Sequence, residues 1–180
     1  MRRIAILGVT APALFLSACA GGGSGGTRAQ PASVTPAVIV SPVLISAAAY
    51  VAAASSIDLY EMRSAQLALE RARDPATKVL AERLLASHQG TSAQLSLAGR
   101  RLNLLPSAEL DPDHQAMLDA LNAASDFDNA YRAQQAIVLQ DGLRLHSGFA
   151  KSGTSPTLRP VAQNAESVLR ANLEALRRSR

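Results

Sequence analysis

Two polar residues, Glu61 and His88, interrupt the apolar stripes of neighbouring predicted helices. A carboxylate and an imidazole that face one helical interior can bind a transition metal or a small ligand, with Asn172 or Tyr60 as a third group. A metal would need more nitrogen and oxygen donors than Glu61 and His88 supply. The two side chains can instead form a buried hydrogen-bonded pair that fixes helix register, because a buried charge must be paired. We favour the pair, which should raise the pKa of the His88 imidazole.

A di-iron centre of the ferritin type is a second chemistry to compare with the sequence. Such a centre takes one Glu from each of two helices and a Glu-x-x-His motif from each of two others. The chain has no Glu-x-x-His, and Glu82 stands six residues before His88, on another helix face. Asp111 precedes His114 by three residues, but Asp111 suits a helix cap. We therefore expect no di-metal centre, and no cofactor except a single transition metal at the Glu61 site.

The other polar side chains have simpler explanations. His114 and His146 are expected to be solvated, one at a helix start and one on a helix flank. Asp128 suits the first turn of a helix, and Tyr131 suits the core. The sequence contains neither a Gly-x-Ser-x-Gly elbow nor a glycine-rich phosphate loop followed by Lys and Ser or Thr. The chain is therefore predicted to have no catalytic activity.

The composition favours helices and argues against nucleic-acid binding. Of the 180 residues, 48% are hydrophobic, yet only 3% are aromatic, and Ala and Leu dominate. The net charge of +4 includes two arginines of a leader, and basic residues cluster along the sequence only at the C-terminus. A nucleic-acid-binding domain needs a basic face or stripe, so nucleic acid is not an expected partner.

Residues 1–18 have the pattern of a secretory signal peptide, and Cys19 follows them directly. Arg2 and Arg3 precede an apolar stretch that ends in small residues. The sequence Leu-Ser-Ala-Cys resembles the lipobox of bacterial lipoproteins, where the signal is cut before a cysteine that carries lipid. Cys19 is the single cysteine and can form no intrachain disulfide, which suits this role. We expect lipidation, including palmitate, at Cys19.

A lipid at Cys19 would anchor the protein to a membrane without spanning it. The apolar leader is too short for a spanning helix that is kept. In a Gram-negative host, Ala20 is not the aspartate usually associated with retention at the inner membrane. We therefore expect the protein at the periplasmic face of the outer membrane, with the lipid as its membrane contact. The sequence identifies no protein partner.

Residues 19–41 and residues 42–178 differ in composition and in the structure they predict. The first stretch is rich in Gly, Ser and Pro and should form a flexible tether. The second carries apolar residues in steps of three and four, the spacing of one helix face. Capping residues, most of them followed by proline, mark the expected helix starts at Ser41-Pro42, Asp74-Pro75, Asp111-Pro112, Ser125 and Ser155-Pro156. Expected helix ends include about Leu105, Ala123 and Lys151, with Arg100 and Arg101 in the last turn of the second helix. The last helix should include Glu174 and Arg178, which form a pair of spacing four.

The order of these elements predicts an all-α domain. No run of alternating apolar residues indicates a strand. Two short turns and one longer loop join four long helices, and the loop leads into a short extra helix before the third long one. The most economical architecture is an antiparallel up-down-up-down four-helix bundle.

Several stretches of the helical domain resemble a bacterial family, the domain of unknown function 4142, which is usually described as ferritin-like. They are YVAAASSIDLYE, QLAL, DPATKVLAERLLASH, SDFDNAY and VLRANL, spread between residues 50 and 176. The resemblance implies an envelope-located, ferritin-like helical bundle without an agreed activity.

The resemblance also implies a set of site residues. Family members often have a carboxylate on the first helix and histidines on the second, third and fourth, which places the carboxylate at Glu61 and the first histidine at His88. Ser87 replaces an aspartate that often precedes that histidine, and Leu139 and Asn172 stand at the positions of the other two. A degenerate metal or small-ligand site at Glu61, His88 and Asn172 is therefore the alternative to a structural or binding role.

Overall fold

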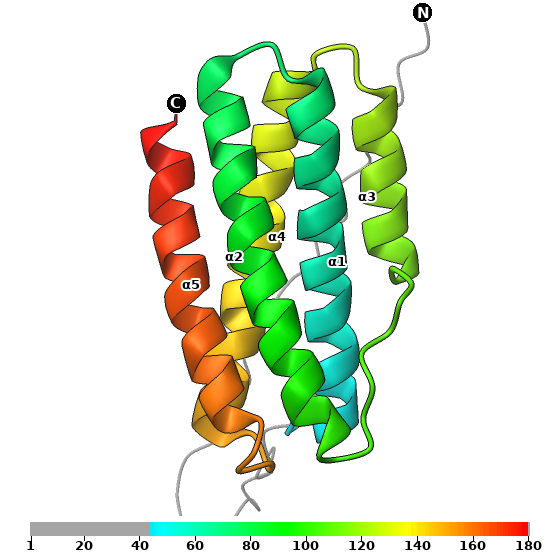
Figure 1. The fold of residues 1–180 in the computed structure, drawn as a ribbon, viewed down its shortest axis with the longest axis vertical. Helices are drawn as coiled ribbons and strands as arrows, with labels where there is room; N and C mark the ends of the chain where they lie inside the picture. Colours follow the sequence, from blue (N-terminus) through cyan, green and yellow to red (C-terminus); the bar gives the residue numbers. More distant parts are fainter. Residues whose placement is uncertain (1–43, 180) are drawn as a thin grey trace, which may run out of the picture. The chain divides into compact units, whose positions relative to one another are not determined.

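The computed structural model describes residues 44–179, and within this range the chain is entirely helical (Figure 1). The helices are α1 (Ala47–Arg71), α2 (Pro75–Arg100), α3 (Pro112–Ala123), α4 (Phe127–Ser152) and α5 (Arg159–Arg178). No strand occurs in residues 44–179, which confirms the predicted all-α class. The predicted signal peptide, the predicted lipidation site Cys19 and the predicted tether lie outside the described residues.

The four long helices pack around a common interior. Helix α1 contacts α2 and α4, and α5 contacts the same two helices, while the short α3 lies against α1 and α4 (Figure 1). The largest core cluster joins α1, α2, α4 and α5 around Leu84, Tyr131 and Leu169. A second cluster, with Tyr50, Leu95 and Phe149, fills the end of the bundle where α1 begins. None of the described helices is long and apolar enough to cross a membrane.

Two of the predicted helix starts are confirmed at the predicted cap residue. Asp74 caps α2 by accepting a hydrogen bond from the N–H of Ala76, and Asp111 caps α3 by accepting one from the N–H of His114. In both cases proline occupies the first turn, where its missing N–H costs nothing. The sequence signal of a capping acid followed by proline therefore located these starts correctly.

The other three starts were predicted too early. Helix α1 is capped by Ser46, whose side chain accepts from the N–H of Ala49, and not by Ser41. Helix α4 is capped by Asp126 and not by its neighbour Ser125. Helix α5 begins at Arg159, because Ser155 caps a preceding turn by accepting from the N–H of Leu158. Serine and aspartate are similarly good N-cap residues, so residue type alone does not tell which candidate caps the helix. We infer that the N-cap depends on which of the following side chains pack into the core.

Helix α2 ends at Arg100, before the predicted end near Leu105. The carbonyl oxygen of Gly99 accepts hydrogen bonds from the N–H groups of Leu102 and Leu104, each at 2.9 Å. Asn103 takes a positive φ of 56°, which turns the chain out of the helix. A Cβ atom at Gly99 would lie 2.1 Å from the carbonyl oxygen of Leu104, so this turn requires glycine.

Candidate functional site

A buried hydrogen bond joins Asp58 on α1 to His88 on α2. The Nδ1 of His88 donates to Oδ1 of Asp58 over 2.8 Å, and the side chains of both residues are almost completely buried. Thr91, one turn after His88, donates its hydroxyl to the same carboxylate oxygen over 2.7 Å. Spacing three places His88 and Thr91 on one face of α2, so both donors reach a single acceptor. This arrangement fixes the tautomer of His88, because an ionised carboxylate can only accept.

The partner of His88 differs from the predicted one. A Glu61–His88 pair was expected, but the hydrogen bond is made by Asp58, one helical turn before Glu61. Both acids face the interior because a spacing of three keeps them on one helix face. Burial alone would lower the pKa of His88, but the hydrogen bond to Asp58 and the charges of Glu61 and Asp58 raise it. The pKa of His88 is therefore raised mainly by Asp58, and not by the hydrogen bond to Glu61 on which the prediction depended.

Glu61 is fully buried, and neither of its carboxylate oxygens has a hydrogen-bond partner among the described residues. Burial raises its pKa to about 7, and the charge of Asp58 adds to this effect, while His88 and Gln135 oppose it. The carboxyl group of Glu61 therefore exchanges between its neutral and ionised forms near neutral pH. An ionised carboxylate without a partner is costly to bury, which is the physical reason for the shift.

Other buried polar atoms near this site also lack a partner within residues 44–179. They are Nε2 of His88, Oε1 of Gln135, the hydroxyl of Tyr131 and Nε2 of His146. Gln135 uses its amide nitrogen to donate to the hydroxyl of Ser64 over 3.1 Å. Each unpaired buried polar atom costs about 1–3 kcal/mol. We call Asp58, Glu61, Ser64, His88, Thr91 and Gln135 the buried polar cluster.

His146 on α4 is buried, so the prediction that it is solvated is wrong. The hydroxyl of Tyr50 lies 3.0 Å from Nδ1 of His146. Burial lowers the pKa of His146 to about 4, with a smaller contribution from the charge of His88, so the imidazole is neutral at neutral pH. Burial also raises the pKa of Tyr50, so its hydroxyl keeps its proton and donates to Nδ1. His146 follows Gly142 by four residues, and this spacing from the interior face was the sequence signal for its burial.

Asn172 and Tyr60, the further candidates, have their own partners. Asn172 is buried on α5, where its side-chain oxygen accepts from Arg83 over 3.2 Å and its nitrogen donates to Ser87 over 2.8 Å. The hydroxyl of Tyr60 donates to Oε1 of Gln134 over 2.6 Å. Asn172 therefore joins α5 to α2 through a contact of its own. A ligand role for it with Glu61 and His88 stays a prediction.

The acid–histidine pair at the start of α3 connects that helix to α1. Nδ1 of His114 lies 2.8 Å from the hydroxyl of Ser56 and 2.9 Å from Oδ2 of Asp111. The N–H of Asp111 also donates to Ser56 over 2.9 Å. His114 is thus partly buried against α1 and not solvated as predicted. Its contacts are those of a helix cap and a helix–helix junction.

Asp128 and the aromatic residues beside it have structural contacts. The carboxylate of Asp128 accepts from the N–H groups of Arg73 and Asp74, in the turn between α1 and α2. Phe127 and Tyr131 are buried and stack with their ring centres 6.1 Å apart. The prediction that Tyr131 belongs to the core is confirmed, and Phe127 belongs to it as well.

The residues at this site do not fit the di-iron centre of a ferritin-like bundle. In the described range, 44–179, no three or more His, Cys, Asp or Glu residues come close enough to hold a metal ion. His88 has only Nε2 available, because Nδ1 donates to Asp58, and no Glu-x-x-His motif brings a second imidazole to Glu61. The cluster offers hydrogen bonds between buried polar groups of neighbouring helices.

Comparison with known proteins places this helical domain in a family. No curated protein and no solved structure matches the chain. The sequence profile of the family described as "Domain of unknown function (DUF4142)" matches residues 31–178, a range that includes all five helices and the buried polar cluster. The chain therefore belongs to the DUF4142 family.

Proposed function

We propose that this protein is a lipid-anchored component of the bacterial envelope that acts by binding or by its structural presence, without catalysis. Its domain is taken to be an up-down-up-down four-helix bundle of the ferritin-like kind. The pairwise contacts of α1 with α2 and α4, and of α5 with the same two helices, support that arrangement.

The observation that carries the proposal is the complete burial of the residues best suited to chemistry. Glu61 and His88 have no exposed surface, and Asp58 is only 2% exposed. A general acid or base must come within hydrogen-bonding distance of the substrate proton that it transfers. A substrate could reach these groups only if the helices separated. The hydrogen bonds of the buried polar cluster instead join α1, α2 and α4, which makes cohesion its best-supported role.

The anchor is tested by labelling cells with radioactive palmitate and separating their membranes. We expect label on the wild-type protein, which should sediment with the outer membrane. The variant Cys19→Ser should lose the label, because it has no thiol to carry the lipid. Equal labelling of the two proteins would overturn the proposed anchor.

A second candidate function is the binding of one transition-metal ion or one small polar molecule beside Glu61 and His88. The unpaired oxygens of Glu61 and the unpaired Nε2 of His88 favour it. The test is the metal content of protein purified without a histidine tag. A stoichiometric transition metal that is lost in Glu61→Gln and in His88→Ala would support this candidate. A content far below one ion per chain would support the cohesive role.

A further inference from the structure

One end of the bundle carries basic residues that are far apart in the sequence. Helix α1 begins there, α2 and α4 end there, and α5 begins there (Figure 1). The second core cluster, which draws on all four of these helix ends, confirms that they lie together. The exposed cations at this end are Arg100, Arg101, Lys151 and Arg159. We call it the basic end.

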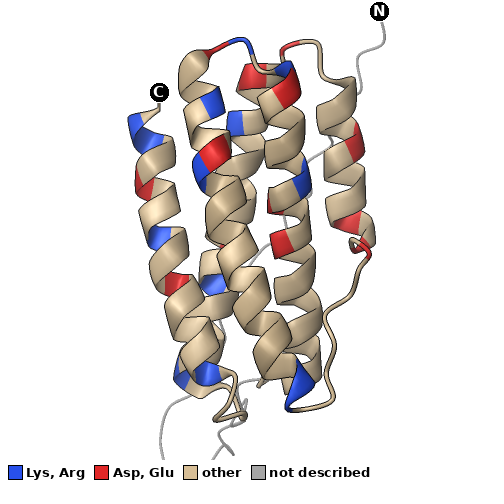
Figure 2. Cartoon of the chain, in the orientation of Figure 1, with Lys and Arg blue, Asp and Glu red and all other residues tan. Residues whose placement is uncertain are grey.

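Acidic residues are missing from the chain segments that build the basic end. Residues 44–57, 83–108 and 142–165 contain no Asp or Glu. Figure 2 shows the acidic positions in the middle of the bundle and toward its opposite end. Within residues 44–179, none of the four cations forms an ion pair. The basic end therefore presents uncompensated positive charge.

The same end exposes large apolar side chains. Of the six exposed large hydrophobic residues in the described range, four belong to it: Leu44 at 51%, Ile45 at 39%, Leu97 at 58% and Leu105 at 73%. Leu105 also borders a hollow of about 340 Å³ between the loop after α2 and the first turns of α1, which is lined mostly by apolar side chains. Exposed apolar side chains beside unpaired cations are typical of surfaces that contact lipid headgroups and the upper acyl chains.

The chain enters the bundle at this end, because the residues that precede α1 lead directly into it. Cys19, the residue proposed to carry the lipid, precedes α1 in the sequence, so the chain that would bear the lipid joins the described domain at the basic end. This step rests on the proposed anchor. It favours a lipid surface over an acidic protein as the partner, because a tethered domain meets that surface at high effective concentration.

We propose that the basic end docks on an anionic phospholipid surface. The cations approach lipid phosphates, and the exposed leucines insert between the headgroups. Each Lys or Arg near an anionic membrane surface strengthens binding by roughly fivefold, and salt weakens this contribution. Docking would fix the orientation of the bundle, with its helix axes standing on the membrane.

The test measures binding of protein without lipid to vesicles, so it does not depend on the anchor. The chain from residue 19 with Cys19→Ser is sedimented with vesicles of phosphatidylglycerol and phosphatidylcholine, or of phosphatidylcholine alone. We expect binding only to the anionic vesicles, with a loss of binding as salt is added. No binding to anionic vesicles at low salt, or equal binding to both kinds, would overturn the proposal.

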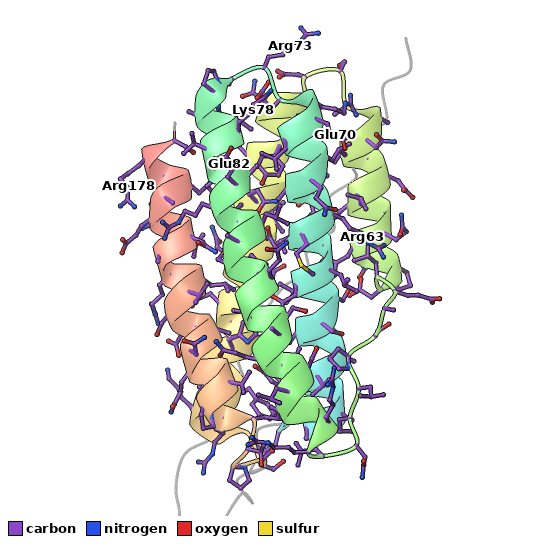
Figure 3. All side chains as sticks on the ribbon, in the orientation of Figure 1. Arg63, Glu70, Arg73, Lys78, Glu82 and Arg178 are labelled. Carbon is purple, nitrogen blue, oxygen red and sulfur yellow. The ribbon has the colours of Figure 1, made fainter. Side chains whose placement is uncertain are left out.

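Two quadruple variants with the same net charge separate the basic end from charge in general. The first carries Arg100→Gln, Arg101→Gln, Lys151→Gln and Arg159→Gln. The control removes four exposed cations at the opposite end through Arg73→Gln, Lys78→Gln, Arg177→Gln and Arg178→Gln. Figure 3 labels Arg73, Lys78 and Arg178 there. We expect a loss of at least about thirtyfold for the first variant and of less than about threefold for the control. Equal losses would contradict a specific docking end.

A second pair of variants tests whether the exposed apolar side chains of the basic end contribute to binding. Leu97→Ser with Leu105→Ser should weaken vesicle binding about tenfold, because buried apolar area is lost. The control, Val79→Ser with Ile137→Ser, removes residues of similar exposure, 65% and 53%, from other faces. It should leave binding unchanged. Circular dichroism checks the helical content of each variant. The two proposals can fail separately. Absence of palmitate would overturn the anchor without affecting the vesicle results, and absence of vesicle binding would overturn the docking end without affecting the anchor.

Discussion

Asp58 holds His88 through a 2.8 Å hydrogen bond between α1 and α2, in an interior that both side chains share with the unpaired carboxyl group of Glu61. One of the two buried carboxyl groups is thus paired with the imidazole, while the other has no hydrogen-bond partner among the described residues. The hydrogen bond pairs the Asp58 carboxylate with the His88 imidazole. Glu61 has no such partner, and burial raises its pKa to about 7. The interior is therefore stabilised by one ion pair and sensitive to the ionisation of one more group.

Removal of the Asp58 carboxylate should destabilise the domain strongly. Asp58→Ala is expected to lower the free energy of unfolding by roughly 3 kcal/mol near neutral pH, because it leaves a buried imidazole without its partner. Thr91→Val is the matched control, since it removes one neutral donor to the same oxygen and should cost about 1 kcal/mol. Urea unfolding measures both. Similar small losses for the two variants would argue against a charged Asp58–His88 pair.

Ionisation of Glu61 should make the domain less stable as the pH rises. Below about pH 4.5 its carboxyl group is protonated in both the folded and the unfolded chain. Between about pH 4.5 and 7 the unfolded chain loses this proton while the folded chain keeps it, so stability falls, by roughly 3 kcal/mol in total. Glu61→Gln should abolish this fall. The check is the difference in unfolding free energy between wild type and variant, measured from about pH 4 to about pH 8.

His146 should contribute a dependence on pH of the opposite sign. Its folded-state pKa of about 4 lies below the ordinary value of 6.5, so the unfolded chain binds a proton first as the pH falls. The contribution of His146 to the free energy of unfolding should therefore rise between about pH 4 and 6.5, by roughly 3 kcal/mol. Because the contribution of Glu61 falls over most of this range, the test is the difference in unfolding free energy between wild type and His146→Gln, which should increase with pH. An unchanged slope would mean that His146 is hydrated in solution.

Much of the helical architecture was predictable from the sequence because its signals are local. The starts of α2 and α3 follow from an acid and a proline, and each helix carries its apolar residues on one face. The start of α1 was not predictable in the same way. Ser41 and Ser46 are both serines, so their type does not tell which one caps the helix; Ser46 lies one turn before Tyr50, the first fully buried residue of α1.

The site and the basic end show what sequence spacing misses. Burial of Glu61 and His88 was predicted because both interrupt apolar stripes, but no apolar pattern marked Asp58 as an inward-facing residue. Which of two inward-facing acids receives a hydrogen bond depends on distances across helices. The cations of the basic end come together only when α2, α4 and α5 pack, so no run of basic residues marks them.

Two glycines of α2 should respond in opposite ways to alanine. Gly99→Ala should destabilise the domain by more than about 2 kcal/mol, since its Cβ would lie 2.1 Å from a backbone oxygen that cannot move aside cheaply. Gly90→Ala meets no atom within 4 Å on an exposed helix face. It should stabilise the domain by about 0.5–1 kcal/mol, because alanine loses less backbone entropy. Thermal and urea unfolding of the two variants give the comparison.

The most direct test of the central claim is a nuclear magnetic resonance titration of the His88 imidazole. The chain has three histidines, so His88→Gln assigns the signal. A structural ion pair with Asp58 predicts a midpoint above the ordinary value of 6.5 in the wild type, and a clear fall of that midpoint in Asp58→Asn. A wild-type midpoint at or below 6.5 that Asp58→Asn leaves unchanged would contradict the pair and the cohesive role built on it.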